Sequence, residues 1–176
     1  ASDVYKRQSL QRADLALFTM CLAMDAGVKE GSNDVQILLV YDEQSGKLED
    51  CLPSDLKSEL DGMAFKGPLG EFCFMAVSSE GFVSRGELYL DLLHIVLNSA
   101  EVKKLIVVPF NEEYGEEVEN VLKESVVESA GQKGNAKDIV FFRMEKPVTP
   151  VAYRWEILGY PLMSALGIRS GDLQNN

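Results

Sequence analysis

The sequence predicts an α/β fold of the mixed α+β kind, with a single mixed β-sheet covered by helices. Three observations support this prediction. Apolar residues recur at helical spacing in several segments and form short, β-branched runs in others. In the first half of the chain, strand signals come in pairs separated by turn residues, which is typical of hairpins. In the second half, helical and strand signals alternate, which is typical of βαβ units.

The first half begins with a helix and continues with strands and turns. The apolar residues between Leu10 and Gly27 predict a buried helix that ends at the glycine. The nearly unbroken apolar run from Val35 to Tyr41 predicts a central strand. We further expect a strand over 47–52, a short helix over 53–62, a turn at 67–70, a strand over 71–78 and a short partner strand over 82–85.

The second half is predicted to alternate between helix and strand. The expected order is a helix over 87–100, a strand over 103–110, a helix over 112–130 and a strand over 138–144. The helix over 112–130 opens on acidic residues, which suit the positive end of the helix dipole. It also spaces Glu119 and Lys123 for an i, i+4 ion pair. Residues 153–158 fit an edge strand.

The length of the chain indicates one domain, which we place over residues 9–146, because 176 residues fit a single hydrophobic core. Residues 147–176 are expected to form a C-terminal extension, with aromatic residues and prolines, that packs on this domain. Residues 1–8 resemble the in-frame translation of a sequencing adapter and are expected to be a disordered tail. On this interpretation the natural chain begins at or before Ser9.

The negative charge of the chain limits the classes of molecule that it is expected to bind. The formal net charge is −11, which repels phosphate backbones and anionic membrane surfaces. No run approaches the roughly 18 apolar residues that span a bilayer. The cysteines Cys21, Cys51 and Cys73 are odd in number and widely spaced, which favours buried, reduced thiols in the cytoplasm over one disulfide with a spare thiol. We therefore expect a protein partner, and no nucleic acid or membrane; the oligomeric state stays open.

The usual signatures of enzymes and cofactor sites are missing from the sequence. The chain has a single histidine and no Cys-x-x-Cys, which argues against zinc sites built on several imidazoles. Gly62 and Gly67 are spaced like the glycines of a Walker loop, but Pro68 occupies the place of the required lysine. There is no Gly-x-Gly-x-x-Gly and no Gly-x-Ser-x-Gly. We expect no metal, no cofactor and no catalytic residue.

Three candidate binding residues lie at the ends of predicted strands. Asp42 comes just after the first strand, Pro109 lies near the end of the strand predicted over 103–110, and Asn111 comes just after that strand. Ligands of open α/β sheets gather beyond the carboxyl ends of the strands, so these residues would also serve a small enzyme. The alternative is that Asp42 and Asn111 are ordinary turn residues at strand ends.

Five further candidates lie on a helix and in the tail. Asp91 and His94 share one polar helix face, where His94 is either an oriented base or a solvated side chain. Tyr153, Arg154 and Trp155 suit a binding surface, in which aromatic residues and arginine are enriched. Packing against the edge of the sheet is an equal alternative for these three.

Carboxylates crowd the start of one predicted helix, at Glu112, Glu113, Glu116, Glu117 and Glu119. A hydrated helix face is the simpler interpretation, and a surface that meets a basic partner or a metal ion is the alternative.

Two strand motifs flank a helix in the middle of the chain. The first is Phe74-Met75-Ala76-Val77-Ser78-Ser79-Glu80, the helix contains Leu90-Asp91-Leu92-Leu93-His94-Ile95-Val96-Leu97-Asn98, and the second is Lys104-Leu105-Ile106-Val107-Val108-Pro109-Phe110-Asn111. This succession, over residues 71–127, resembles the N-terminal domain of SseB-type proteins, the bacterial enhanced serine sensitivity family. That family carries a Phe-Thr-Ser-like strand end and a strand ending in Asn-Pro-Phe. Here Val77-Ser78 replaces the aromatic-Thr pair, and Val108 replaces the asparagine. The resemblance implies a binding or regulatory module without a catalytic residue.

Three hypotheses for the function follow. The first is a non-enzymatic binding or regulatory module of unknown ligand. The second is a small enzyme with a carboxylate and hydroxyl site at the carboxyl ends of the strands. The third is an acidic partner that neutralises a basic protein, which the net charge suggests.

Overall fold

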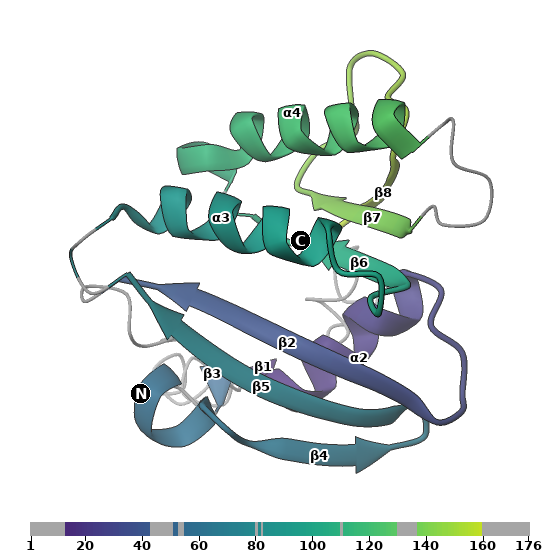
Figure 1. Ribbon diagram of the computed structural model, residues 1–176. Coiled ribbons are helices and arrows are strands. Elements are labelled where there is room, and N and C mark those ends of the chain that lie inside the picture. Colours follow the sequence, from purple (N-terminus) through teal and green to yellow (C-terminus); the bar gives the residue numbers. More distant parts are fainter. Residues whose placement is uncertain are drawn as a thin grey trace, which may run out of the picture. The chain divides into compact units, whose positions relative to one another are not determined.

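The computed structural model describes residues 13–42, 51–52, 55–79, 81, 83–109, 111–129 and 137–159, and it confirms the mixed α+β class (Figure 1). The strands of these residues do not form the one expected sheet. They form a mixed sheet, a parallel sheet and a two-stranded pair. Pattern alone shows that a segment is a strand, whereas its pairing is decided by tertiary contacts.

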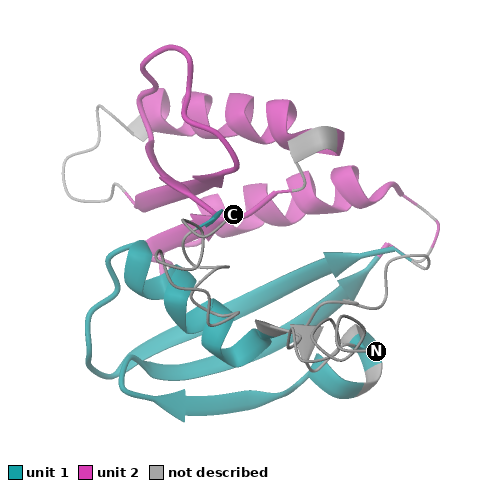
Figure 2. Cartoon of the chain, turned by 180° about the vertical axis from the view of Figure 1, so that it is seen from behind, with its two compact units in different colours: residues 1–78, 159–176 teal, residues 79–158 magenta. Residues whose placement is uncertain are grey.

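The chain divides into two compact units (Figure 2). Unit 1 contains residues 1–78 and 159–176, and unit 2 contains residues 79–158. The single domain expected over residues 9–146 therefore spans the strands of unit 1 but only part of unit 2, which continues to residue 158. Residues 1–8, which we expect to be a tail, lie outside the described residues.

Unit 1 is a helix on a three-stranded mixed sheet. Its described elements are β1 (Ala13–Asp14), α2 (Leu15–Asp25), β2 (Asn33–Tyr41), β3 (Cys51–Leu52), the π-helix η1 (Leu56–Leu60), β4 (Ala64–Gly67) and β5 (Gly70–Ser78). The strand order is β2-β5-β4, with β2 parallel and β4 antiparallel to β5. The carboxylate of Asp14 caps α2 by accepting hydrogen bonds from the backbone N–H groups of Ala16 and Leu17, at 2.9 and 3.3 Å.

The predicted turn at residues 67–70 joins β4 to β5 as a tight hairpin, in which Gly67 pairs with Gly70. The core beside this hairpin is aromatic. The rings of Phe65 and Phe72 stack with their centroids 4.9 Å apart, and Phe72 is fully buried. β4 was not predicted from the sequence; it is only four residues long and alternates between partly buried and exposed side chains.

Unit 2 is built around a parallel sheet. Its elements are α3 (Arg85–Leu97), β6 (Lys104–Val107), α4 (Asn111–Ser129), β7 (Asp138–Arg143) and β8 (Arg154–Ile157), with the strand order β6-β7-β8. The segment β6-α4-β7 is a βαβ unit, as the alternating pattern predicted. Of the strand predicted over 82–85, residue 82 lies outside the described residues, and Arg85 begins α3 instead, because Ser84 and Glu87 form a capping box there.

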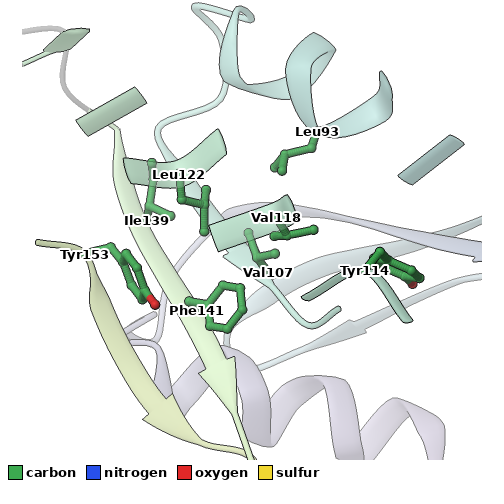
Figure 3. Packing of buried hydrophobic residues seen from close by; sticks show 8 residues of the cluster. All are labelled: Leu93, Val107, Tyr114, Val118, Leu122, Ile139, Phe141 and Tyr153. Atoms are coloured by element: carbon green, nitrogen blue, oxygen red, sulfur yellow. The ribbon is translucent and has the colours of Figure 1, made fainter. Parts of the chain in front are cut away.

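The core of unit 2 lies between the helices and one face of this sheet (Figure 3). Alternate residues of a strand point to opposite faces, so Ile139 and Phe141 of β7 share the face that packs against α4. Val118 and Leu122 of α4 are fully buried against it, as helical spacing requires. The buried members of the cluster are Leu93, Val107, Tyr114, Val118, Leu122, Ile139, Phe141 and Tyr153.

Candidate functional site

Glu119, Arg143 and Tyr153 of unit 2 form a hydrogen-bonded cluster, which we call the polar triad. The hydroxyl of Tyr153 donates to Oε1 of Glu119 at 2.6 Å. The guanidinium of Arg143 donates to the same oxygen and, at 3.0 Å, to the hydroxyl of Tyr153. Arg143 ends β7, Tyr153 directly precedes β8 and Glu119 lies on α4, so three elements meet at this cluster.

The polar triad rests on the ring of Phe141. The guanidinium carbon of Arg143 lies 5.9 Å from the ring centroid, within range of a cation–π interaction. The ring of Tyr153 packs 5.4 Å from the same centroid. The side chains of Arg143 and Glu119 are only 23% and 22% exposed. Because the ion pair is shielded from water on its apolar side, its geometry is better fixed than that of a surface pair.

A hollow of about 270 Å³ opens beside the polar triad. It is lined by Gly115, Glu116, Glu119, Arg143, Met144 and Glu145. Three carboxylates and one guanidinium therefore border it. Since Arg143 already pairs with Glu119, the exposed carboxylates of Glu116 and Glu145 give the rim a negative charge. We call this feature the acidic hollow.

The exposed side of α4 continues this acidic surface. The helix buries Tyr114, Val118 and Leu122, and it presents Glu113, Glu116, Glu117, Glu124 and Glu128 to solvent. A shallower hollow of about 300 Å³ lies further along α4, lined by Lys123, Glu124, Val127 and Glu128. The acidic hollow has the charge and the partly apolar lining to hold one cationic side chain with its aliphatic stem.

The acidic residues predicted at the start of this helix have different surroundings. Glu113 forms an ion pair with Arg85, and Glu116 and Glu117 are exposed. The side chain of Glu112 lies outside the described residues. Glu119 binds Arg143 in place of the expected local partner.

A second charged cluster lies at the amino ends of the parallel strands. Nζ of Lys104 lies 2.6 Å from Oδ2 of Asp138, and the guanidinium of Arg154 lies 2.7 Å from both carboxylate oxygens. Burial raises the pKa of Asp138, but hydrogen bonds from Lys104 and Arg154 outweigh it and hold that pKa below its usual value. This cluster ties β6, β7 and β8 together, which gives Arg154 a structural role.

The aromatic residues of the predicted tail pack in the core of unit 2. Tyr153 is buried and Trp155 is partly buried against the core cluster, whereas Arg154 between them is exposed. Strand alternation accounts for this arrangement, because β8 pairs with β7 and faces the core on one side. Tyr153 and Trp155 therefore pack inside unit 2, in keeping with packing, the alternative to a binding surface.

The other candidate residues do not line the acidic hollow. Asp42 follows β2 in unit 1, whereas Pro109 is buried after β6 in unit 2. Asn111 begins α4, and its side chain lies outside the described residues. Asp91 and His94 are both exposed on α3.

Sequence reasoning missed the role of Arg143 and placed Glu119 only in an acidic helix face. One signal was present. Arg143 follows Ile139 and Phe141 at a spacing of two, so strand alternation places it on the face of β7 that packs against α4. A charged residue on such a face requires a partner, and the crossover helix that covers the face is the nearest source of one.

Among the described residues, no three His, Cys, Asp or Glu side chains come together in a way that could hold a metal ion. None of the helices that the structure describes is long and apolar enough to cross a membrane.

Residues 4–173 match the model of a family of unknown function, DUF6621. The chain belongs to this family. No curated protein and no solved structure matches the chain. The DUF6621 match extends over most of both compact units, so it includes the polar triad, the acidic hollow and the mixed sheet.

Replacing Arg143 by methionine is expected to lower the free energy of unfolding by about 2 kcal/mol, because the shielded carboxylate of Glu119 loses its charge partner. Adding Glu119→Gln should recover about 1 kcal/mol, since the unpaired charge is then gone. The check is chemical denaturation followed by the fluorescence of Trp155, the only tryptophan. Lys123→Met, on the exposed side of α4, is the matched control and should change stability by less than about 0.5 kcal/mol. Strictly additive losses for Arg143 and Glu119 would contradict a coupled triad.

Proposed function

We propose that this member of the DUF6621 family is a non-enzymatic binding module, and that it takes a basic segment of a partner protein at the acidic hollow. The proposal rests on the charges of the residues that border this hollow. Glu116 and Glu145 surround a space beside a guanidinium that is already neutralised by Glu119. A lysine or arginine side chain entering this space meets carboxylates that form no ion pair within the described part of the chain, and lays its stem against Met144.

The charge of the whole chain supports the same partner. At a net charge of −11, the protein attracts a basic segment over a distance of about a Debye length, roughly 8 Å at physiological salt. The exposed carboxylates along α4 extend the attraction beyond the hollow itself. This interaction would set the rate of association and select against acidic partners.

Family resemblance and thiol chemistry support a regulatory module of the bacterial cytoplasm. The strand–helix–strand segment over residues 71–127 suggests a relation to SseB-type domains. For this chain we therefore propose a binding role without catalysis. Cys21 and Cys73 are free thiols, in keeping with a reducing compartment. Burial and the nearby carboxylate of Asp25 raise the pKa of the Cys21 thiol, which keeps it protonated and poorly reactive.

The proposal predicts a charge-specific loss of binding. A fluorescent oligo-arginine peptide is titrated into the full chain at low salt, and its anisotropy gives the Kd. Glu116→Lys/Glu145→Lys should weaken binding by at least about tenfold, which corresponds to about 1.4 kcal/mol. Binding to the unchanged chain should also weaken as salt is added.

The matched control is Glu30→Lys/Glu101→Lys. These carboxylates are exposed and are not among the residues that line the acidic hollow, and the double substitution changes the net charge equally. The control should bind the peptide nearly as well as the unchanged chain. Equal weakening in both variants would show that only the overall charge matters and would refute a defined site.

A further inference from the structure

One strand edge in unit 1 is long and has no partner among the described residues. β2 pairs along one side with β5 over its full length, from Asn33 with Gly70 to Tyr41 with Ser78. In the described part of the chain it is the end strand of the sheet order β2-β5-β4. An edge of this kind presents a row of backbone N–H and C=O groups that can pair with another strand.

The other edge strands of the two three-stranded sheets carry the features that usually prevent such pairing. β4, β6 and β8 have four residues each, and they contain the charged residues Lys66, Lys104 and Arg154. β2 has nine residues, no proline and a single charged residue, Asp34, near its beginning. Since natural proteins shorten, charge or cover their edges, β2 has the character of a strand that is covered by a partner.

The side chains of β2 also suit a partner strand. Ile37 and Leu39 are partly buried and pack against the core clusters on the helix side of the sheet. On the opposite face Leu38 is 37% exposed, beside Met75 of β5, which is 48% exposed. A strand added next to β2 would extend both faces and cover part of this exposed apolar surface.

We propose that β2 pairs with β2 of a second copy of the chain, antiparallel, about a twofold axis at Ile37. A twofold axis can join two identical strands side by side only in the antiparallel sense. Centring the pair on Ile37 aligns all nine residues and keeps the helix-side residues of both copies on one face. Position 36 then lies opposite position 38 of the other copy, and Asp34 lies opposite Val40, so that no like charges meet. The two three-stranded sheets become one continuous sheet with β4 at each end.

The test uses the full chain in sedimentation velocity over a series of concentrations. The unchanged chain should form a dimer. Gln36→Lys/Leu38→Lys places lysine opposite lysine twice across the axis and should raise the dimer Kd by at least about tenfold. Gln36→Lys/Leu38→Glu places opposite charges there and should keep the dimer. Both positions are exposed, and circular dichroism checks that each variant folds.

Hydrogen exchange supplies a second measurement, because amides of β2 should exchange more slowly in the dimer than in the lysine variant. A chain that is monomeric at every concentration would overturn the proposal, and so would equal weakening by the two variants. Slow exchange at β2 in a monomer would show that another part of the chain covers this edge, which also overturns it. Glu116→Lys/Glu145→Lys should leave the dimer Kd unchanged. The dimer test is therefore independent of the test of peptide binding at the acidic hollow.

Discussion

Phe141→Ala is expected to lower the free energy of unfolding of unit 2 by about 4 kcal/mol. The ring is 1% exposed and lies in the core cluster with Val107 and Leu122. Removing it leaves a cavity in addition to the lost burial, and it also removes the surface on which Tyr153 and Arg143 rest. The loss should therefore exceed that of removing the Arg143 ion pair.

Denaturation by urea, followed through Trp155, measures this loss directly, because Trp155 packs against the same cluster and pairs with Phe141 in the sheet. Val148→Ala is the matched control. Val148 is fully exposed, so its truncation should change stability by less than about 0.5 kcal/mol. A loss of under about 1 kcal/mol for Phe141→Ala would contradict a central position for this ring.

Gly70→Ala is expected to destabilise unit 1 by about 3 kcal/mol, from crowding and from an unfavourable backbone angle together. Gly70 begins β5 with φ at +131°, which L side chains rarely adopt. A Cβ atom there would lie 2.0 Å from the carbonyl oxygen of Asn33 and 2.6 Å from its nitrogen. Both are backbone atoms of β2, so the two parallel strands would have to separate at this point.

Gly62→Ala separates the cost of the backbone angle from the cost of crowding. Gly62 also has a positive φ, +81°, but a Cβ atom there would meet no heavy atom within 4 Å in the described part of the chain. Only the backbone cost remains, and we expect a loss of about 1 kcal/mol. Thermal unfolding followed by circular dichroism compares the two variants. Equal losses would contradict the close approach of Gly70 to β2.

Periodic apolar segments allowed most elements of the fold to be predicted. β2, β5, β6 and β7 are apolar runs, and α4 has a clear helical stripe, so local pattern and tertiary structure agree. The partition into separate sheets was not predictable in this way, because pairing depends on contacts between distant segments. β4 escaped prediction because a four-residue edge strand beside a Gly-Pro turn has too few residues to show a period.

The candidate site shows the same division between local and distant information. Spacing along the helix suggested Lys123 as the partner of Glu119, whereas the crossover from β6 to β7 places Glu119 over the end of β7 and next to Arg143. The acidic residues of the hollow were visible in the sequence as part of a charged helix. Their proximity to Glu145 could not be predicted from the sequence, because Glu145 follows β7 and only the folded chain brings it next to α4.

The most direct test of the acidic hollow as a binding site is a nuclear magnetic resonance titration of the isotope-labelled full chain with the oligo-arginine peptide. We expect the largest shifts of backbone amides at Gly115, Glu116, Met144 and Glu145, with smaller shifts along the exposed side of α4. The same resonances should stay unchanged when an oligo-glutamate peptide is added. Shifts spread evenly over the exposed carboxylates of both units, or concentrated away from these residues, would contradict the account.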